Sequence, residues 1–228
     1  MLAKMETLPE GSMKGNGKGS PPNFYDMDLD YQGGARCFEL ANGESLQNDG
    51  NGLRAKLAWP DGYGQLLRHP WRFPDYLEKP RLLFDKKRGR PARDLEGQDG
   101  FWYVSRAMKE LLERVEPNAC EFRKCDTVWV SGEPGPEYWL CSITRFLYGW
   151  DVIEFEASRG LTQYNAPDGL PYYNISDLTG LRFRAEVVGP FHLFRVIGFE
   201  RYVFCDQFMK DACKTARIKG ITFRKMGE

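Results

Sequence analysis

Apolar residues follow a helical spacing in two separate parts of the chain. Ser105, a good helix N-cap, belongs to a segment whose apolar stripe is Val104, Met108, Leu111, Leu112 and Val115. Segment 108–125 aligns without a gap on segment 209–226, and this alignment puts Ser105 on Asp206, another good N-cap. The corresponding stripe is made of smaller residues: Cys205, Met209, Ala212, Cys213 and Ala216. Because strand-like residues flank both helices, the pattern predicts two β-α-β units, at about 101–125 and 202–226.

Within the segment 24–31, residues 25–31 alternate between apolar and acidic side chains. Tyr25, Met27, Leu29 and Tyr31 alternate with Asp26, Asp28 and Asp30. A period of two predicts a β-strand with one apolar face and one acidic face. Further strands are predicted at 37–40, 81–84, 119–130, 138–147, 151–157, 181–189, 191–198 and 201–204, with a turn at Gly189–Pro190. The expected fold class is therefore α+β, mostly antiparallel β, with one helix from each β-α-β unit.

The composition along the chain divides it into three parts. Residues 1–23 are rich in Gly, Ser, Lys and Pro, which predicts a disordered leader. Residues 24–100 are expected to form N-terminal β-structure and an irregular aromatic-rich segment, since prolines in 59–85 exclude a long helix and 86–100 is a polar loop. Residues 101–228 form the β-rich core with the two capped helices. A single domain over 24–228 is the alternative division.

Composition narrows the class of protein. Hydrophobic residues make up 42% of the chain and aromatic residues 14%, which indicates a globular protein. Lys and Arg number 32, as do Asp and Glu, so charge gives no reason to expect nucleic-acid or membrane binding. Without a long apolar run or a secretory signal, a cytoplasmic protein is expected. The six cysteines are scattered and lack a CxxC pair, which predicts buried free thiols.

Two groups of residues are candidates for binding a partner. The first is the acidic series Asp26, Asp28 and Asp30, which resembles the start of a calcium loop. Such a loop requires Gly and Glu where this chain has Tyr31 and Cys37, so no metal site is predicted. The series is either a solvated strand face or a docking stripe for a basic partner. The second group is aromatic and is either core or a set of exposed binding anchors: Trp59, Tyr63, Trp71 and Tyr76.

Two other functions are weaker alternatives. Arg88–Pro91 matches the short core of a DNA minor-groove hook, but nearby acidic residues would repel phosphate, so nucleic-acid binding is not expected. No catalytic or nucleotide-binding motif such as GxSxG, HExxH or a P-loop occurs in the chain. An enzyme would therefore need a dispersed His/Cys/Asp site around His69 or His192.

The 101–125 segment belongs to a pattern that is familiar from one protein family. An aromatic strand is followed by Val-Ser opening a helix and by a Glu-Phe strand, here Trp102–Tyr103, Val104–Ser105 and Glu121–Phe122. Later elements match too: Tyr138–Leu140, Trp150–Val152, Leu193–Val196, the cap Asp206 and Gly220–Phe223. Over about 85–228 the chain resembles the bacterial polymorphic-toxin immunity proteins of the mostly-β immunity family numbered eleven.

This resemblance implies a function by binding. An immunity protein neutralises a cognate secreted bacterial toxin in the cell that makes it, and the toxins linked to this family are often nucleases. No enzymatic activity, catalytic residue, cofactor or metal is implied, because the shared residues build strands and helix caps. The expected partner is the toxin protein, with no role for a membrane or a nucleic acid.

Overall fold

The computed structural model describes residues 22–46, 72–73, 75–98, 101–165 and 171–227. About 21% of the chain is helical and 38% is strand, and most strand pairs are antiparallel. The α+β, mostly-β fold class predicted from the sequence is therefore confirmed.

Both predicted helices are present and begin where their caps predicted. They are α1 (Arg106–Val115) and α4 (Gln207–Thr215), with one-turn helices α2 (Gly149–Val152) and α3 (Ala185–Val188) between them. Ser105 Oγ accepts the Met108 N–H at 3.3 Å, and Asp206 Oδ1 accepts the Met209 N–H at 3.0 Å. Each cap satisfies a backbone donor that has no partner within its own helix.

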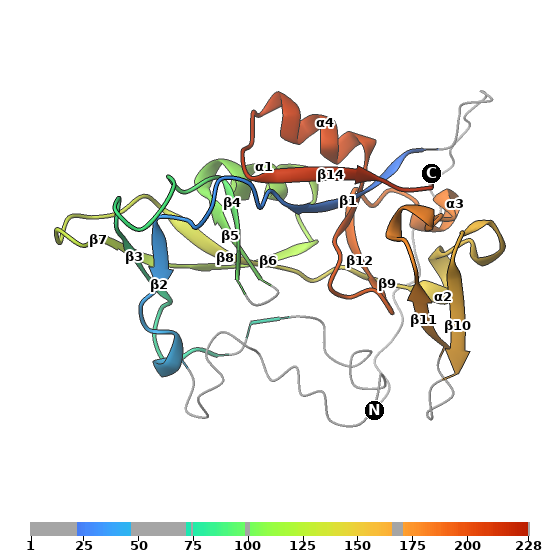
Figure 1. Cartoon of the computed structure of the whole chain (residues 1–228), viewed down its shortest axis with the longest axis horizontal. Helices are drawn as coiled ribbons and strands as arrows, with labels where there is room; N and C mark the ends of the chain where they lie inside the picture. The colour runs from blue at the N-terminus through green and yellow to red at the C-terminus, as the bar shows by residue number, and fades with distance from the viewer. Residues whose placement is uncertain (1–21, 47–71, 74, 99–100, 166–170, 228) are drawn as a thin grey trace.

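The strands described by the structure pair into four groups (Figure 1). A five-stranded sheet has the order β14 (Ile221–Lys225), β1 (Phe24–Leu29), β13 (Phe204–Asp206), β12 (Leu193–Ile197) and β9 (Phe146–Tyr148). A four-stranded sheet has the order β4 (Leu95–Gln98), β5 (Phe101–Ser105), β8 (Tyr138–Ile143) and β6 (Cys120–Lys124). A three-stranded sheet contains β2 (Phe38–Leu40), β3 (Arg81–Phe84) and β7 (Asp126–Trp129), and β10 (Leu161–Asn165) pairs with β11 (Pro171–Ile175).

The two β-α-β units are built in the same way. In the first unit β8 lies between β5 and β6, antiparallel to both, and in the second unit β1 lies between β13 and β14 in the same manner. The cross-strand register is also the same, with Val104–Trp139–Lys124 in the first unit and Cys205–Tyr25–Lys225 in the second. Strand β1 thus completes the C-terminal unit, although it comes from the other end of the chain.

Buried side chains of the described residues form three clusters on the faces of these sheets. One cluster joins both helices to both large sheets, through residues such as Met108, Leu112 and Met209. Figure 1 shows α1 and α4 on the same side of the molecule. The opposite face of the four-stranded sheet packs on the three-stranded sheet, and the opposite face of the five-stranded sheet packs on the β10–β11 hairpin and the short helices.

Two predicted strands are each divided into two. Residues 119–130 form β6 and β7, which belong to different sheets, and residues 138–147 form β8 and β9. The first division is at Cys125, whose N–H donates to the Tyr138 carbonyl at 3.0 Å. A period of two in the sequence shows which residues are half-buried, but it does not show where a strand changes its partner.

Other predictions at 86–100, 151–157 and 181–189 are wrong in part. The expected strands at 151–157 and 181–189 are mainly helical turns, α2 with a 3-10 turn at Phe155–Ala157 and α3. Some of their apolar residues are buried, such as Val152, Ile153 and Val188, and burial alone does not distinguish a strand from a helical turn. The expected polar loop at 86–100 contains β4, which pairs with β5.

Candidate partner-binding groove

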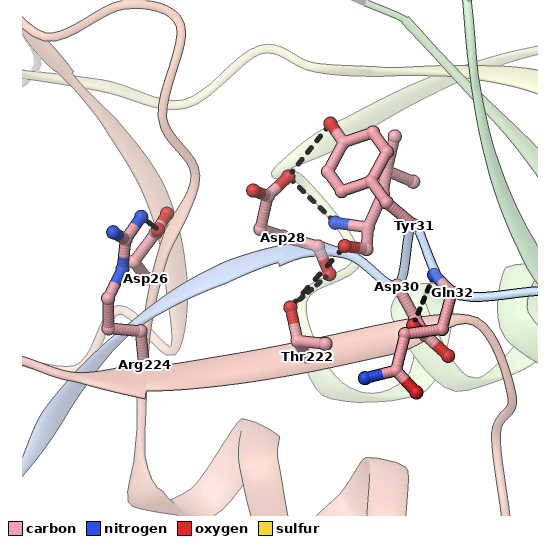
Figure 2. Close-up of a pocket in the computed structure, with 8 residues that line it drawn as sticks. Asp26, Asp28, Asp30, Tyr31, Gln32, Thr222 and Arg224 are labelled. Atoms are coloured by element: carbon pink, nitrogen blue, oxygen red, sulfur yellow. Dashed lines mark hydrogen bonds and ion pairs between the residues drawn. The ribbon is translucent and has the colours of Figure 1, made fainter.

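An open groove of about 530 Å³ lies over the outer face of β1 and β14. Its lining comes from β1, from the turn that follows β1, and from β14 (Figure 2). All three aspartates of the predicted acidic stripe line it, together with Thr222 and Arg224 of the facing strand. The structure thus brings this candidate set together in one concave surface, while giving each aspartate a different environment.

Asp26 is a buried carboxylate. It is 1% exposed and lies opposite Arg224, whose Nη2 is 2.6 Å from Asp26 Oδ2. Burial raises the pKa of Asp26, and the hydrogen bond from Arg224 opposes that rise. The idea of a fully solvated acidic face is therefore wrong for Asp26, because the sheet and Arg224 cover it.

Asp30 is also engaged within the protein. Its Oδ2 is 2.6 Å from Arg93 Nη1, and its Oδ1 accepts the Gln32 N–H at 2.9 Å. These contacts hold the turn after β1 against the segment that leads into β4.

Asp28 differs from both neighbours because its cross-strand partner is Thr222 rather than a basic residue. Its Oδ1 accepts the Leu29 N–H at 2.7 Å and lies 3.5 Å from the Tyr31 hydroxyl. Within the described part of the chain, no Lys, Arg or His forms an ion pair with Asp28. Figure 2 shows the Asp28 side chain between the Asp26–Arg224 pair and Tyr31. Asp28 is therefore the carboxylate of the stripe that is available to a cation from outside.

Tyr31 is an exposed aromatic residue at one end of the groove. The alternation predicted it on the apolar face of the strand, but β1 ends at Leu29 and Tyr31 is 75% exposed. The turn that follows uses Gly33 and Gly34, both with positive φ. The Gly-Gly pair in the sequence was the signal that the strand ends before Tyr31.

The aromatic candidates do not form part of the groove as far as the structure describes them. Trp59, Tyr63 and Trp71 lie outside the described residues. Tyr76 is half-buried, with its ring 6.1 Å from that of Phe73, and burial raises its pKa. Its packing belongs to the cluster under the four-stranded sheet.

The described residues of the alternative enzymatic site have contacts or burial that fit a structural role. His69 lies outside the described residues. His192 Nδ1 is 2.7 Å from Oδ2 of Asp206, and Asp206 is also the N-cap of α4. The adjacent Cys205 is fully buried, and burial raises its pKa well above the ordinary value. A thiol that stays protonated is a poor nucleophile.

Residues of the DNA-binding alternative also have contacts within the protein. Arg88 pairs with Glu39, and Arg90 pairs with the buried Glu96, with Nη2 2.8 Å from Oε2. Among the residues that the structure describes, no group of His, Cys, Asp and Glu is arranged to hold a metal ion. The described helices also include none long and apolar enough to cross a membrane.

Comparison with models of protein families gives a match. The model of an immunity protein family (Imm11) matches residues 36–228, a span that includes α1, α4 and every described strand except β1. No curated protein matches the chain. The match covers more of the chain than the 85–228 resemblance seen in the sequence, and it begins after the acidic stripe.

Proposed function

The chain belongs to the Imm11 family of immunity proteins, and we propose that it acts by binding a cognate secreted bacterial toxin and neutralising it in the cytoplasm of the producing cell. The family supports a role in immunity by binding rather than by catalysis. The observation that carries the proposed binding site is the Asp28 carboxylate, which lies in an open groove and forms no close ion pair with a Lys, Arg or His among the described residues.

A nuclease is the toxin class that fits this groove best. Nucleases bind a polyanion and therefore carry basic surfaces, as nucleic-acid-binding proteins generally do. A basic residue of the toxin would pair with Asp28, and Tyr31 beside it offers an exposed ring of the type found in binding hot spots. The groove would then cover the positive surface that the toxin uses to hold its substrate.

Co-expression tests the proposed function directly. The toxin gene adjacent to this gene is expressed in a sensitive bacterium with and without the immunity protein, and growth and nucleic-acid integrity are measured. We expect growth to be restored and cellular DNA or RNA to remain intact. Continued toxicity in the presence of soluble immunity protein would refute the proposal, while rescue from a toxin that leaves nucleic acid intact would refute only the nuclease assignment.

Charge reversal at Asp28 tests the groove. Asp28→Lys should slow association with a catalytically inactive toxin by roughly threefold to tenfold at low salt, because long-range attraction between unlike charges speeds encounter. The effect should shrink at high salt, where charges are screened. Asp126→Lys is the matched control, since Asp126 is an exposed aspartate on β7 in a different sheet. Equal association rates for the two variants, measured by stopped-flow mixing, would remove Asp28 from the interface.

A further inference from the structure

Strand β14 is at the end of the five-stranded sheet, and its outer edge is unpaired among the described strands. In an antiparallel pair, alternate residues direct their backbone N–H and C=O groups toward the neighbouring strand. The Asp30 N–H donates to the Gly220 carbonyl at 3.0 Å, and the Met226 N–H donates to the Phe24 carbonyl at 3.0 Å. These two bonds fix the pattern, so that even-numbered residues of β14 bond to β1.

The odd-numbered residues of β14 therefore direct their backbone groups outward. They are Ile221, Phe223 and Lys225, and no hydrogen bond to their backbone groups occurs among the described residues. Gly227 continues the pattern, and its N–H donates to the Thr179 carbonyl at 2.7 Å. Three successive outward-facing residues form a template on which another extended segment can pair.

The two faces of this edge differ in chemistry. On one face Ile221 and Phe223 pack against the cluster under α1 and α4. On the other face exposed Thr222 lies in the groove, directly opposite Asp28. If a strand paired with the outer edge of β14, one of its residues would lie opposite Thr222. The backbone of that residue would be two strand spacings, or roughly 10 Å, from the Asp28 backbone. A lysine or arginine at that place can extend over the short threonine to the Asp28 carboxylate.

We propose that the toxin adds an extended segment to β14, with a basic residue opposite Thr222 and an apolar residue opposite Phe223. This proposal rests on the proposed function and specifies how the partner docks. The edge supplies backbone hydrogen bonds, the groove supplies the countercharge, and the partly buried Phe223 supplies an apolar contact. The occupant is thus an amphipathic strand that alternates basic and apolar side chains.

Two other sheet edges offer less to a partner. At the opposite end of the same sheet, β9 is only three residues long. In the four-stranded sheet, the edge strand β6 is approached by another part of the chain, since Glu121 Oε2 accepts the Phe73 N–H at 3.1 Å. The edge of β14 is longer than β9 and lies beside an open groove.

A proline at an outward-facing position tests the edge without breaking the bonds to β1. Lys225→Pro removes an outward N–H and leaves the bonds of Arg224 and Met226 to β1 in place, because Lys225 is exposed and its N–H points away. Lys225→Ala is the matched control, since it removes the same side chain and keeps the N–H. We expect Lys225→Pro to weaken binding of the inactive toxin by roughly tenfold, and Lys225→Ala by less than about threefold.

Amide exchange measured by NMR gives a second readout that needs no variant. In the free protein the amides of Ile221, Phe223 and Lys225 should exchange faster than those of Thr222, Arg224 and Met226. In the toxin complex the three odd-numbered amides should become protected, which is the pattern of an added strand.

The outcomes separate the two proposals. If the wild-type protein fails to bind the toxin, the proposed function and the docking mode both fall. If the toxin binds but Lys225→Pro binds like Lys225→Ala and the odd-numbered amides stay unprotected, only the docking mode is overturned. Protection of these amides that rises with concentration in the absence of toxin would assign the edge to a second copy of this chain, and would also overturn the proposal.

Discussion

At the scale of single residues, the three aspartates of β1 share a spacing but not an environment. Asp26 occupies the position that the fully buried Leu140 occupies in the first β-α-β unit. Leu140 lies on the central strand of its unit and pairs with Tyr103, and Asp26 lies on the central strand of the second unit and pairs with the equivalent Phe204. Arg224 lies opposite Asp26, as Arg123 lies opposite Leu140. In the second unit a carboxylate, Asp26, therefore lies at a position that is apolar in the first unit, and the guanidinium group of Arg224 covers it. Asp28 instead faces the groove.

The burial of Asp26 has a consequence for the pH dependence of stability. Because burial raises the pKa of Asp26 above its value of 3.8 in the unfolded chain, the folded protein binds the proton more tightly. This contribution to the free energy of unfolding is complete below pH 3.8 and is lost as the pH rises through the folded-state pKa.

Replacing Asp26 with asparagine should remove this contribution. We expect the free energy of unfolding of Asp26→Asn to fall less than that of the wild type as the pH rises from about 4 to 7. Urea unfolding at a series of pH values measures it, and Asp126→Asn serves as the control because Asp126 is an exposed aspartate in a different sheet. The explanation fails if the two asparagine variants have the same pH profile.

At the scale of elements, helix α1 is tied to strand β12 by one buried carboxylate. Glu116, at the C-terminal end of α1, is 4% exposed. It accepts the N–H groups of His192 and Leu193, the latter at 3.3 Å, and it pairs with Arg145. The carboxylate thereby joins the first β-α-β unit to a strand of the five-stranded sheet.

Removal of this carboxylate should weaken the fold substantially. Glu116→Ala leaves two backbone donors and a guanidinium group without their acceptor, which we expect to lower the free energy of unfolding by about 3 kcal/mol. Glu113→Ala is the control, since this exposed residue of the same helix pairs with Lys109 at the surface and its replacement should cost about 0.5 kcal/mol. Similar urea midpoints for the two variants would contradict the role of Glu116.

Elements with strong local signals were predicted well, and short apolar segments were not. Ser105 and Asp206 each precede a long apolar stripe, and both helices begin at these caps. The segments at 151–157 and 181–189 have only a few apolar residues each. Their helical turns depend on contacts such as the Ile153–Phe183 bridge, which links residues far apart in the chain.

At the scale of the whole molecule, the two β-α-β units differ in the origin of their central strand. Strand β8 comes shortly after the first unit in the sequence. Strand β1 lies near the other end of the chain from the second unit, and it is outside the span 36–228 that matches the family. Strands β13 and β14 pair with opposite edges of β1, so β1 holds the C-terminal unit together.

Deleting β1 should therefore unfold more than the N-terminus. A chain that lacks residues 1–31 exposes the edges of β13 and β14 and the cluster beneath Met27, and we expect it to lose cooperative thermal unfolding. Adding a synthetic peptide of residues 22–31 should restore that transition, as measured by circular dichroism. Deletion of residues 1–21 alone is the control and should leave the transition unchanged. Cooperative unfolding of the longer deletion without the peptide would show that β1 is dispensable.

The sequence by itself determined the features whose signals are local. It was sufficient for the mostly-β class, the two capped helices, the repeat and the acidic alternation, since caps and periodicity act within a few residues. It also carried enough of the family pattern to indicate an immunity protein, and the family match confirms that membership.

Tertiary structure decided what depends on residues far apart in the chain. It put β1 between β13 and β14, buried Asp26 beneath Arg224, paired Asp30 with Arg93 and left Asp28 facing the groove. Evenly spaced aspartates on one strand are equivalent in the sequence, but their burial and pairing depend on side chains from Arg93 and β14. Strand order is likewise invisible to local periodicity, because the same alternation suits a central strand and an edge strand.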